Sequence, residues 1–123
     1  MKIIFLIFTL CYSLFAKLTY VDVTELERLK LPIIDIRTQN EFKQTGTIPK
    51  AHKITFFDEF GRYDFVSWEK DLLSIIDDKN SSFVLVCRSG GRTTKVGTYL
   101  SDIGYKNIYH LKGGIKSWIN KKD

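Results

Sequence analysis

The chain has 123 residues, which is enough for one domain but not for two. Hydrophobic residues make up 44% of it and charged residues 27%, a globular composition that excludes a disordered or low-complexity chain. The two cysteines are too few for a disulfide scaffold, and the scattered cysteines and histidines lack the spacing of a zinc site. A net charge of +5, spread along the chain, gives little support to a nucleic-acid partner.

The N-terminal segment differs from the rest of the chain. Lys2 supplies positive charge, and residues 3–16 then carry no charged side chain. A membrane span needs about 20 apolar residues, so this shorter run ending in the small Ala16 is typical of a secretory signal. We therefore expect residues 1–16 to be a signal peptide and 17–123 one exported domain, periplasmic or otherwise outside the cytoplasm, with no stable membrane association after cleavage. The alternative is a protein anchored to the membrane by the uncleaved segment.

The domain is predicted to begin with a short helix and a buried strand. Thr24 and Glu27 have the spacing of a capping box, which predicts a helix from Glu25. Pro32 ends that helix. The apolar residues around Asp35 in 33–36 then indicate a buried strand.

A second helix and an irregular segment follow. Thr38 and Glu41 form another capping box, and Gly46 ends the helix that it opens. Residues 51–55 are a short strand candidate. Residues 56–66 are rich in aromatic side chains but contain a glycine and several acids, which predicts a packed loop.

The second half repeats the alternation of helix and strand. Apolar spacing predicts a helix over residues 68–76, and the polar run that follows predicts a surface turn over 77–82. Four consecutive apolar residues make 83–86 the strongest strand signal in the chain. The remaining elements are predicted in this order: a helix over 93–103 with Gly104 beyond its end, a strand over 107–111 and a helix over 115–120. This order predicts βαβ units and a mainly parallel sheet.

A glycine- and arginine-rich loop follows the strongest strand. It consists of Cys87, Arg88, Ser89, Gly90, Gly91, Arg92 and Thr93. The glycines allow a tight curl whose N–H groups point inward, and the next helix adds the positive end of its dipole. The arginines add positive charge and the hydroxyls add donors. These surroundings favour the thiolate form, so we expect Cys87 to be a nucleophile in an anion-binding cradle open to small molecules.

Other interpretations of these residues stay open at this stage. A cysteine that ends an apolar strand can be a small buried hydrophobe, although packing does not explain the glycines and arginines after it. Asp35, Arg37 and Glu41 resemble an acid/base set, but a structural charge network at the first strand end is the preferred interpretation, and Arg37 can also help to orient the loop. His52 and His110 lack metal-ligand spacing and are expected to be structural or to face solvent.

Four stretches together resemble a known family. They are residues 33–42, 46–51, 84–93 and 104–118. In this order they are similar to a single-domain rhodanese, a sulfurtransferase, of an exported bacterial type, over roughly residues 20–118. The family often has histidine and glycine where this chain has Thr47 and Lys50, two positions that shape a turn.

The resemblance implies an α/β fold with a five-stranded, mainly parallel sheet flanked by helices on both faces. It also implies that Cys87 takes a sulfane sulfur from an anionic donor such as thiosulfate, forms a persulfide held by the loop N–H groups, and passes the sulfur to cyanide or a thiol, which can be a protein thiol. Neither a metal nor an organic cofactor is implied. Asp35 and Arg37 would support the loop.

Two alternatives to sulfur transfer remain. Related phosphatases and arsenate reductases have a loop one residue longer than the four residues that separate Cys87 and Arg92, so the shorter loop favours sulfur over a tetrahedral oxyanion. The second alternative is a non-enzymatic rhodanese-like module that binds a protein partner or carries a persulfide. A module that only binds a partner would have no need for Cys87 and the basic loop.

Overall fold

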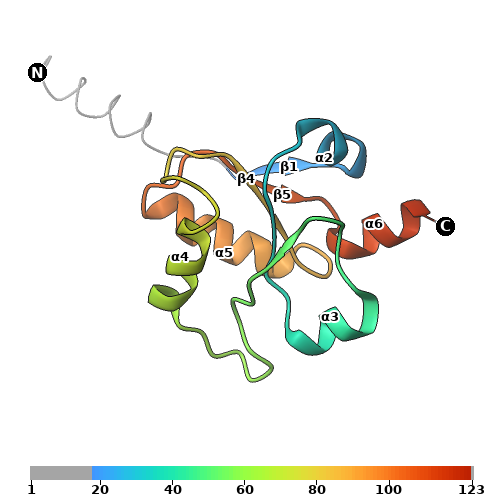
Figure 1. Ribbon diagram of the computed structural model, residues 1–123, viewed down its shortest axis with the longest axis horizontal. Helices are drawn as coiled ribbons and strands as arrows, with labels where there is room; N and C mark the ends of the chain where they lie inside the picture. The colour runs from blue at the N-terminus through green and yellow to red at the C-terminus, as the bar shows by residue number, and fades with distance from the viewer. Residues whose placement is uncertain (1–17, 123) are drawn as a thin grey trace, which may run out of the picture.

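A five-stranded sheet forms the centre of the computed structural model, which describes residues 18–122 (Figure 1). Its strands are β1 (Thr19–Val21), β2 (Ile33–Asp35), β3 (His52–Lys53), β4 (Phe83–Val86) and β5 (Ile108–Leu111). The order across the sheet is β1-β5-β4-β2-β3, and every neighbouring pair is parallel. The predicted parallel α/β fold is therefore confirmed, whereas the proposed signal peptide lies outside the described residues.

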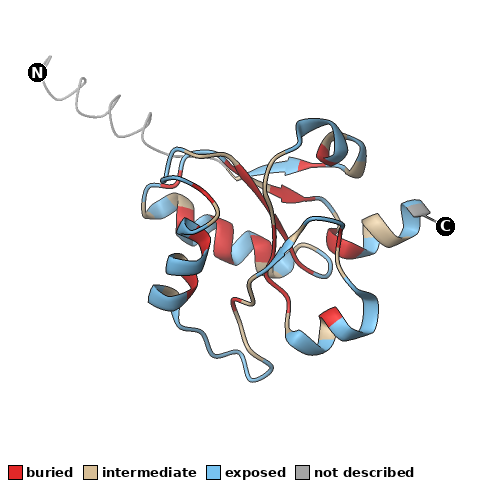
Figure 2. Ribbon diagram, viewed as in Figure 1, coloured by how far each residue is buried: buried red, intermediate tan, exposed pale blue. Residues whose placement is uncertain are grey.

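Five helices cover the two faces of the sheet. They are α2 (Val23–Leu29), α3 (Gln39–Thr45), α4 (Phe65–Leu73), α5 (Gly91–Asp102) and α6 (Gly114–Lys122). Successive side chains of a strand point to opposite faces, so Phe83 and Leu85 join one buried cluster with residues of α4 and α5. Val84 and Val86 join the other with residues of α2 and α6. All four residues of β4 are buried, which explains the continuous apolar run in the sequence (Figure 2).

The register of the central strands places the loop after β4 beside the turn after β2. Asp35, the last residue of β2, pairs with Val86, the last residue of β4. Both segments therefore leave the sheet at the same carboxyl edge, where parallel α/β sheets usually bind ligands.

The first helix begins earlier than its predicted start. Asp22, not Thr24, is the N-cap: its Oδ1 accepts from the N–H of Glu25 at 2.8 Å, and Glu25 Oε1 accepts from the N–H of Asp22 at 3.3 Å. Two overlapping capping boxes are present in the sequence, and the one that directly follows β1 forms. The strand β1 itself gave no apolar run, because only Val21 of its three residues is buried. The second capping box, Thr38 with Glu41, forms as predicted.

Two helix starts in the second half also differ from the prediction. Asp64 caps α4, which begins at Phe65 and not at residue 68, so the packed loop predicted over 56–66 ends two residues sooner. The helix α5 begins at Gly91 and not at Thr93, because Gly90 supplies the left-handed turn that starts it (φ +111°). Lys50, which stands where the family often has glycine, has φ +69°, a left-handed conformation that glycine adopts more easily than lysine.

Candidate active site

The thiol of Cys87 lies directly beyond the carboxyl end of β4, on the same side of the sheet as Leu85. Its Sγ accepts a hydrogen bond from the backbone N–H of Gly90 at 3.1 Å. The positive φ of Gly90 turns that N–H back toward the sulfur, and an L side chain rarely adopts this conformation. The curl predicted from the two glycines is therefore present, with one amide directed at the sulfur.

The opposite side of the loop is held by the start of α6. The carbonyl oxygens of Cys87 and Arg88 accept hydrogen bonds from the N–H groups of Ile115 at 2.8 Å and Lys116 at 3.3 Å. A Cβ on Gly114 would lie 2.5 Å from these two carbonyl oxygens. Neither Gly114 nor Ile115 is among the predicted site residues, although both belong to the last family-like stretch.

The sulfur lies beneath the loop rather than in the open. Cys87 is 1% exposed and belongs to the same buried cluster as Ile36, Phe56 and Val96. Arg88 and Ser89 are exposed above it. An open thiol was expected, and the burial arises because β4 delivers Cys87 to the face of the sheet that α4 and α5 cover. A donor would therefore have to be small, or the loop would have to move.

Arg92 joins the loop to α3 through a bidentate ion pair with Glu41. Nη1 lies 2.6 Å from Oε1, and Nη2 lies 2.7 Å from Oε2. The hydrogen bonds from Arg92 lower the pKa of Glu41 to about 2, against the smaller opposing effect of burial. Arg92 therefore braces the start of α5, and Glu41 pairs with this loop residue and not with Asp35 and Arg37 as expected.

Replacement of Glu41 by glutamine should show the contribution of this ion pair to stability. Because the folded-state pKa lies below the usual 4.5, the stabilisation is complete above about pH 4.5 and is lost as the pH falls toward 2. Glutamine at this helix position keeps the capping hydrogen bonds. At pH 6, we expect the free energy of unfolding in urea to be about 1–3 kcal/mol larger for wild type than for Glu41→Gln. This difference should shrink steadily toward pH 2.5. A difference independent of pH would contradict the assignment.

Asp35 and Arg37 form a separate, fully buried pair at the end of β2. Arg37 Nε and Nη2 donate to the carboxylate of Asp35 at 2.9 and 2.7 Å. The hydroxyl of Thr47 donates to the same carboxylate at 2.5 Å, and Arg37 also donates to Thr45 Oγ1 and to the carbonyl oxygen of Gly46. Every one of these contacts holds the β2–α3–β3 connection. Within residues 18–122, neither side chain forms a hydrogen bond or ion pair with Cys87 or its loop, so the contacts of the pair are structural.

Thr93 connects the thiol to a histidine on the neighbouring strand. Its Oγ1 lies 3.6 Å from Cys87 Sγ, 3.0 Å from the carbonyl oxygen of Gly90 and 3.0 Å from His110 Nδ1. His110 is 1% exposed, and burial lowers its pKa. Its place near the thiol follows from the pairing of His110 with Leu85 across β4 and β5, a register that the sequence alone does not reveal. The other histidine, His52, is exposed on β3.

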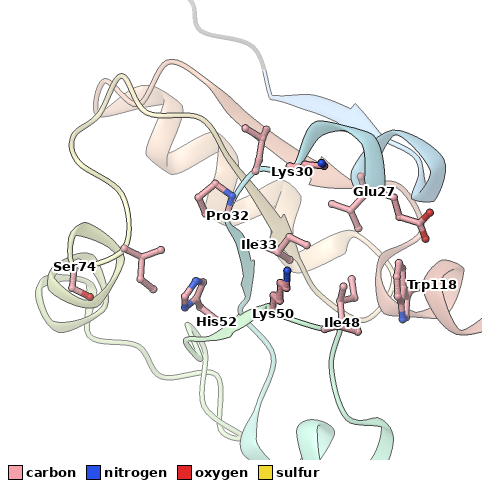
Figure 3. A pocket seen from close by; sticks show the side chains of 13 residues that line it. Glu27, Lys30, Pro32, Ile33, Ile48, Lys50, His52, Ser74 and Trp118 are labelled. Carbon is pink, nitrogen blue, oxygen red and sulfur yellow. The ribbon is translucent and has the colours of Figure 1, made fainter.

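Two hollows in the surface differ in their relation to the Cys87 loop. One, of about 380 Å³, lies against Arg92 and Lys95 of α5 and the loop around Glu59. The other is a groove of about 850 Å³ with an apolar floor that includes Ile33 and Trp118, and it contains no residue of the Cys87 loop (Figure 3). Among residues 18–122 there is no cluster of three or more potential metal-binding histidine, cysteine or acidic side chains.

Comparison with known proteins agrees with this geometry. The model of the rhodanese-like domain matches residues 22–121. A protein of Rickettsia conorii is 32% identical over 91 residues, with 68% of each chain covered. Among solved structures, a rhodanese-like domain protein from Staphylococcus aureus has a TM-score of 0.61 at 27% identity, covering 82% of this chain and 91% of that one. The human single-domain sulfurtransferase has the same fold, with a TM-score of 0.62 at 18% identity over 87% of this chain and 100% of its own.

The family model covers most of the chain, and it includes the loop, the ion pairs and the start of α6 described above. The five-stranded parallel sheet and its flanking helices are the fold of the structural neighbours. The chain therefore belongs to the rhodanese-like family, which includes sulfurtransferases.

Proposed function

We propose that this protein is a sulfurtransferase in which Cys87 carries a sulfane sulfur from an anionic donor such as thiosulfate to cyanide or a thiol. The observation that carries the proposal is the hydrogen bond from the Gly90 N–H to Cys87 Sγ at the N-terminus of α5. A backbone donor and the positive end of a helix dipole both favour a sulfur anion at this point.

The proposed reaction has two balanced steps. The Cys87 thiolate attacks the outer sulfur of thiosulfate, the S–S bond of the donor breaks, and sulfite leaves with the electron pair. The product is a persulfide anion on Cys87, whose terminal sulfur the acceptor thiolate or cyanide then attacks. This second step breaks the new S–S bond and returns the Cys87 thiolate, so no external oxidant or reductant is needed.

The geometry supports a role for loop residues other than Arg92 in contacting the donor. Arg92 is engaged by Glu41, whereas Arg88 and Ser89 are exposed above the sulfur. We therefore propose Arg88 as the cation that attracts the anionic donor and the loop amides as the groups that hold the persulfide. Arg92, through its ion pair with Glu41, keeps the loop in shape.

The decisive measurement is the intact mass of the reduced protein after thiosulfate treatment. Wild type is expected to gain one sulfur atom and to lose it when cyanide is added. Cys87→Ser should gain none, and Cys11→Ser, which removes the other cysteine of the chain, should behave as wild type. Uptake that persists in Cys87→Ser would overturn the proposal.

The mass measurement and a phosphatase assay together decide between the enzyme and its rivals. No sulfur uptake by wild type from thiosulfate or other sulfane donors would favour a module that only binds a protein partner. Hydrolysis of an aryl phosphate that depends on Cys87 would favour phosphatase chemistry over sulfur transfer.

The cellular location of the reaction stays a prediction from the sequence. Residues 1–16 are proposed as a signal for export, and they precede the described part of the chain. Among the described residues, no helix combines the length and the apolar character needed to cross a membrane.

A further inference from the structure

The hydroxyl of Thr93 has one proton and three polar neighbours. The carbonyl oxygen of Gly90 can only accept, and it already receives the N–H of Thr94 at 3.2 Å and the Thr94 hydroxyl at 2.9 Å. The proton of Thr93 is therefore not needed there. It can turn toward Cys87 Sγ when the sulfur is an anion. The oxygen of Thr93 can then accept a hydrogen bond from another donor.

His110 can be that donor. Its Nδ1 lies 3.0 Å from Thr93 Oγ1, and its Nε2 is buried with no hydrogen-bond partner in the described part of the chain. Burial keeps the ring neutral, so it holds a single proton. A proton on Nε2 would be a buried donor without an acceptor, which is less favourable than an unprotonated ring nitrogen without a donor. A proton on Nδ1 avoids this and directs an N–H at Thr93.

We propose that His110 is a positioning residue: its Nδ1–H donates to Thr93 Oγ1, which directs the Thr93 hydroxyl to the sulfur anion of Cys87. This inference rests on the proposed function only where it concerns the persulfide. The same hydrogen bond would stabilise the Cys87 thiolate whether or not the protein transfers sulfur. It adds a second donor to the Gly90 N–H and explains why a histidine is buried on β5. The ring of Tyr20 stacks on the ring of His110, with the ring centroids 4.0 Å apart, and fixes the plane of the imidazole.

The pH dependence of Cys87 alkylation by iodoacetamide, in a Cys11→Ser background, tests the relay without requiring sulfur transfer. His110→Leu removes the donor and should raise the midpoint by about one pH unit, which is a roughly tenfold loss of reactive thiolate below the midpoint. His110→Asn places an amide N–H near the position of Nδ1 and should stay close to wild type. The charged groups of the loop, Arg88 and Arg92 with its partner Glu41, are unchanged in all variants.

A double-mutant cycle separates a relay from a general packing effect. Thr93→Val should shift the midpoint as much as His110→Leu, and the double variant should shift it no further, because both changes break one chain of hydrogen bonds. Additive shifts, or a wild-type midpoint in His110→Leu, would overturn the proposal. If His110→Leu fails to fold, ¹⁵N NMR of the wild-type ring decides the matter. An Nδ1-protonated tautomer is expected, and an Nε2-protonated one would refute the relay.

The result is independent of the reaction proposed for the protein. Wild type that takes up no sulfur but shows these alkylation shifts would refute the sulfurtransferase and keep the relay. If wild type takes up sulfur while His110→Leu is alkylated with the wild-type pH dependence, the sulfurtransferase is supported and the relay is refuted.

Discussion

Replacing Arg37 with methionine is expected to destabilise the protein by about 3–5 kcal/mol, the usual cost of removing one partner from a buried ion pair. Asp35 is fully buried, and the substitution removes the three hydrogen bonds that Arg37 donates to its carboxylate. The carboxylate would retain the hydroxyl of Thr47 and the backbone N–H of residue 37. Urea unfolding at pH 7 measures the loss.

The chain offers a matched control for this substitution. Arg62 forms an ion pair with Asp58, but its side chain is 74% exposed. Arg62→Met removes the same groups at the surface, where water replaces them, and should change stability little. A similar loss in the two variants would show that burial does not determine the cost.

A double variant, Asp35→Leu with Arg37→Met, tests the same idea from the other side. Removing both charges leaves no uncompensated carboxylate, so at least half of the stability lost in Arg37→Met should return. Recovery would be incomplete because the Gly46 carbonyl oxygen and the Thr47 hydroxyl lose their partners. No recovery at all would mean that the pair contributes through these neighbours and not through its charges.

The buried pair also shows where prediction from sequence succeeds and where it fails. The strand β4 and the loop from Cys87 to Thr93 could be located in advance, because a continuous apolar run and paired glycines are local signals. The preference for a structural network at Asp35 and Arg37 also matches their contacts, but nothing in the local sequence indicated that both would be almost wholly buried.

Contacts between distant segments could not be predicted in the same way. The Glu41–Arg92 pair joins residues 51 positions apart, and the approach of His110 to Thr93 depends on the register between β4 and β5. Both follow from the packing of helices and strands, which the pattern of one sequence leaves undetermined. The strand β1 escaped detection for a related reason: it is a three-residue edge strand whose identity depends on pairing with β5.

Gly114→Ala is expected to damage both stability and the proposed sulfur transfer. Gly114 has φ +63°, and an added Cβ would lie 2.5 Å from the backbone carbonyl oxygens of Cys87 and Arg88. These atoms belong to the main chain, so the loop or the start of α6 must move. The hydrogen bonds from Ile115 and Lys116 that hold the two carbonyls would lengthen. We expect a loss of about 2–4 kcal/mol, from backbone strain and overpacking together.

The displacement should also slow formation of the Cys87 persulfide by about 100-fold, since an error of 1 Å in a reacting group can have that effect. Gly104→Ala is the matched control, because Gly104 also has a positive φ (+105°) but an added Cβ would meet only the flexible side chain of Lys79 at 3.7 Å. It should lose stability through backbone strain and keep the wild-type rate. Rates of sulfur uptake followed by intact mass distinguish the two variants. If Gly114→Ala forms the persulfide as fast as Gly104→Ala, then α6 does not hold the loop in its reactive shape, and the amide of Gly90 is positioned by β4 and α5 alone.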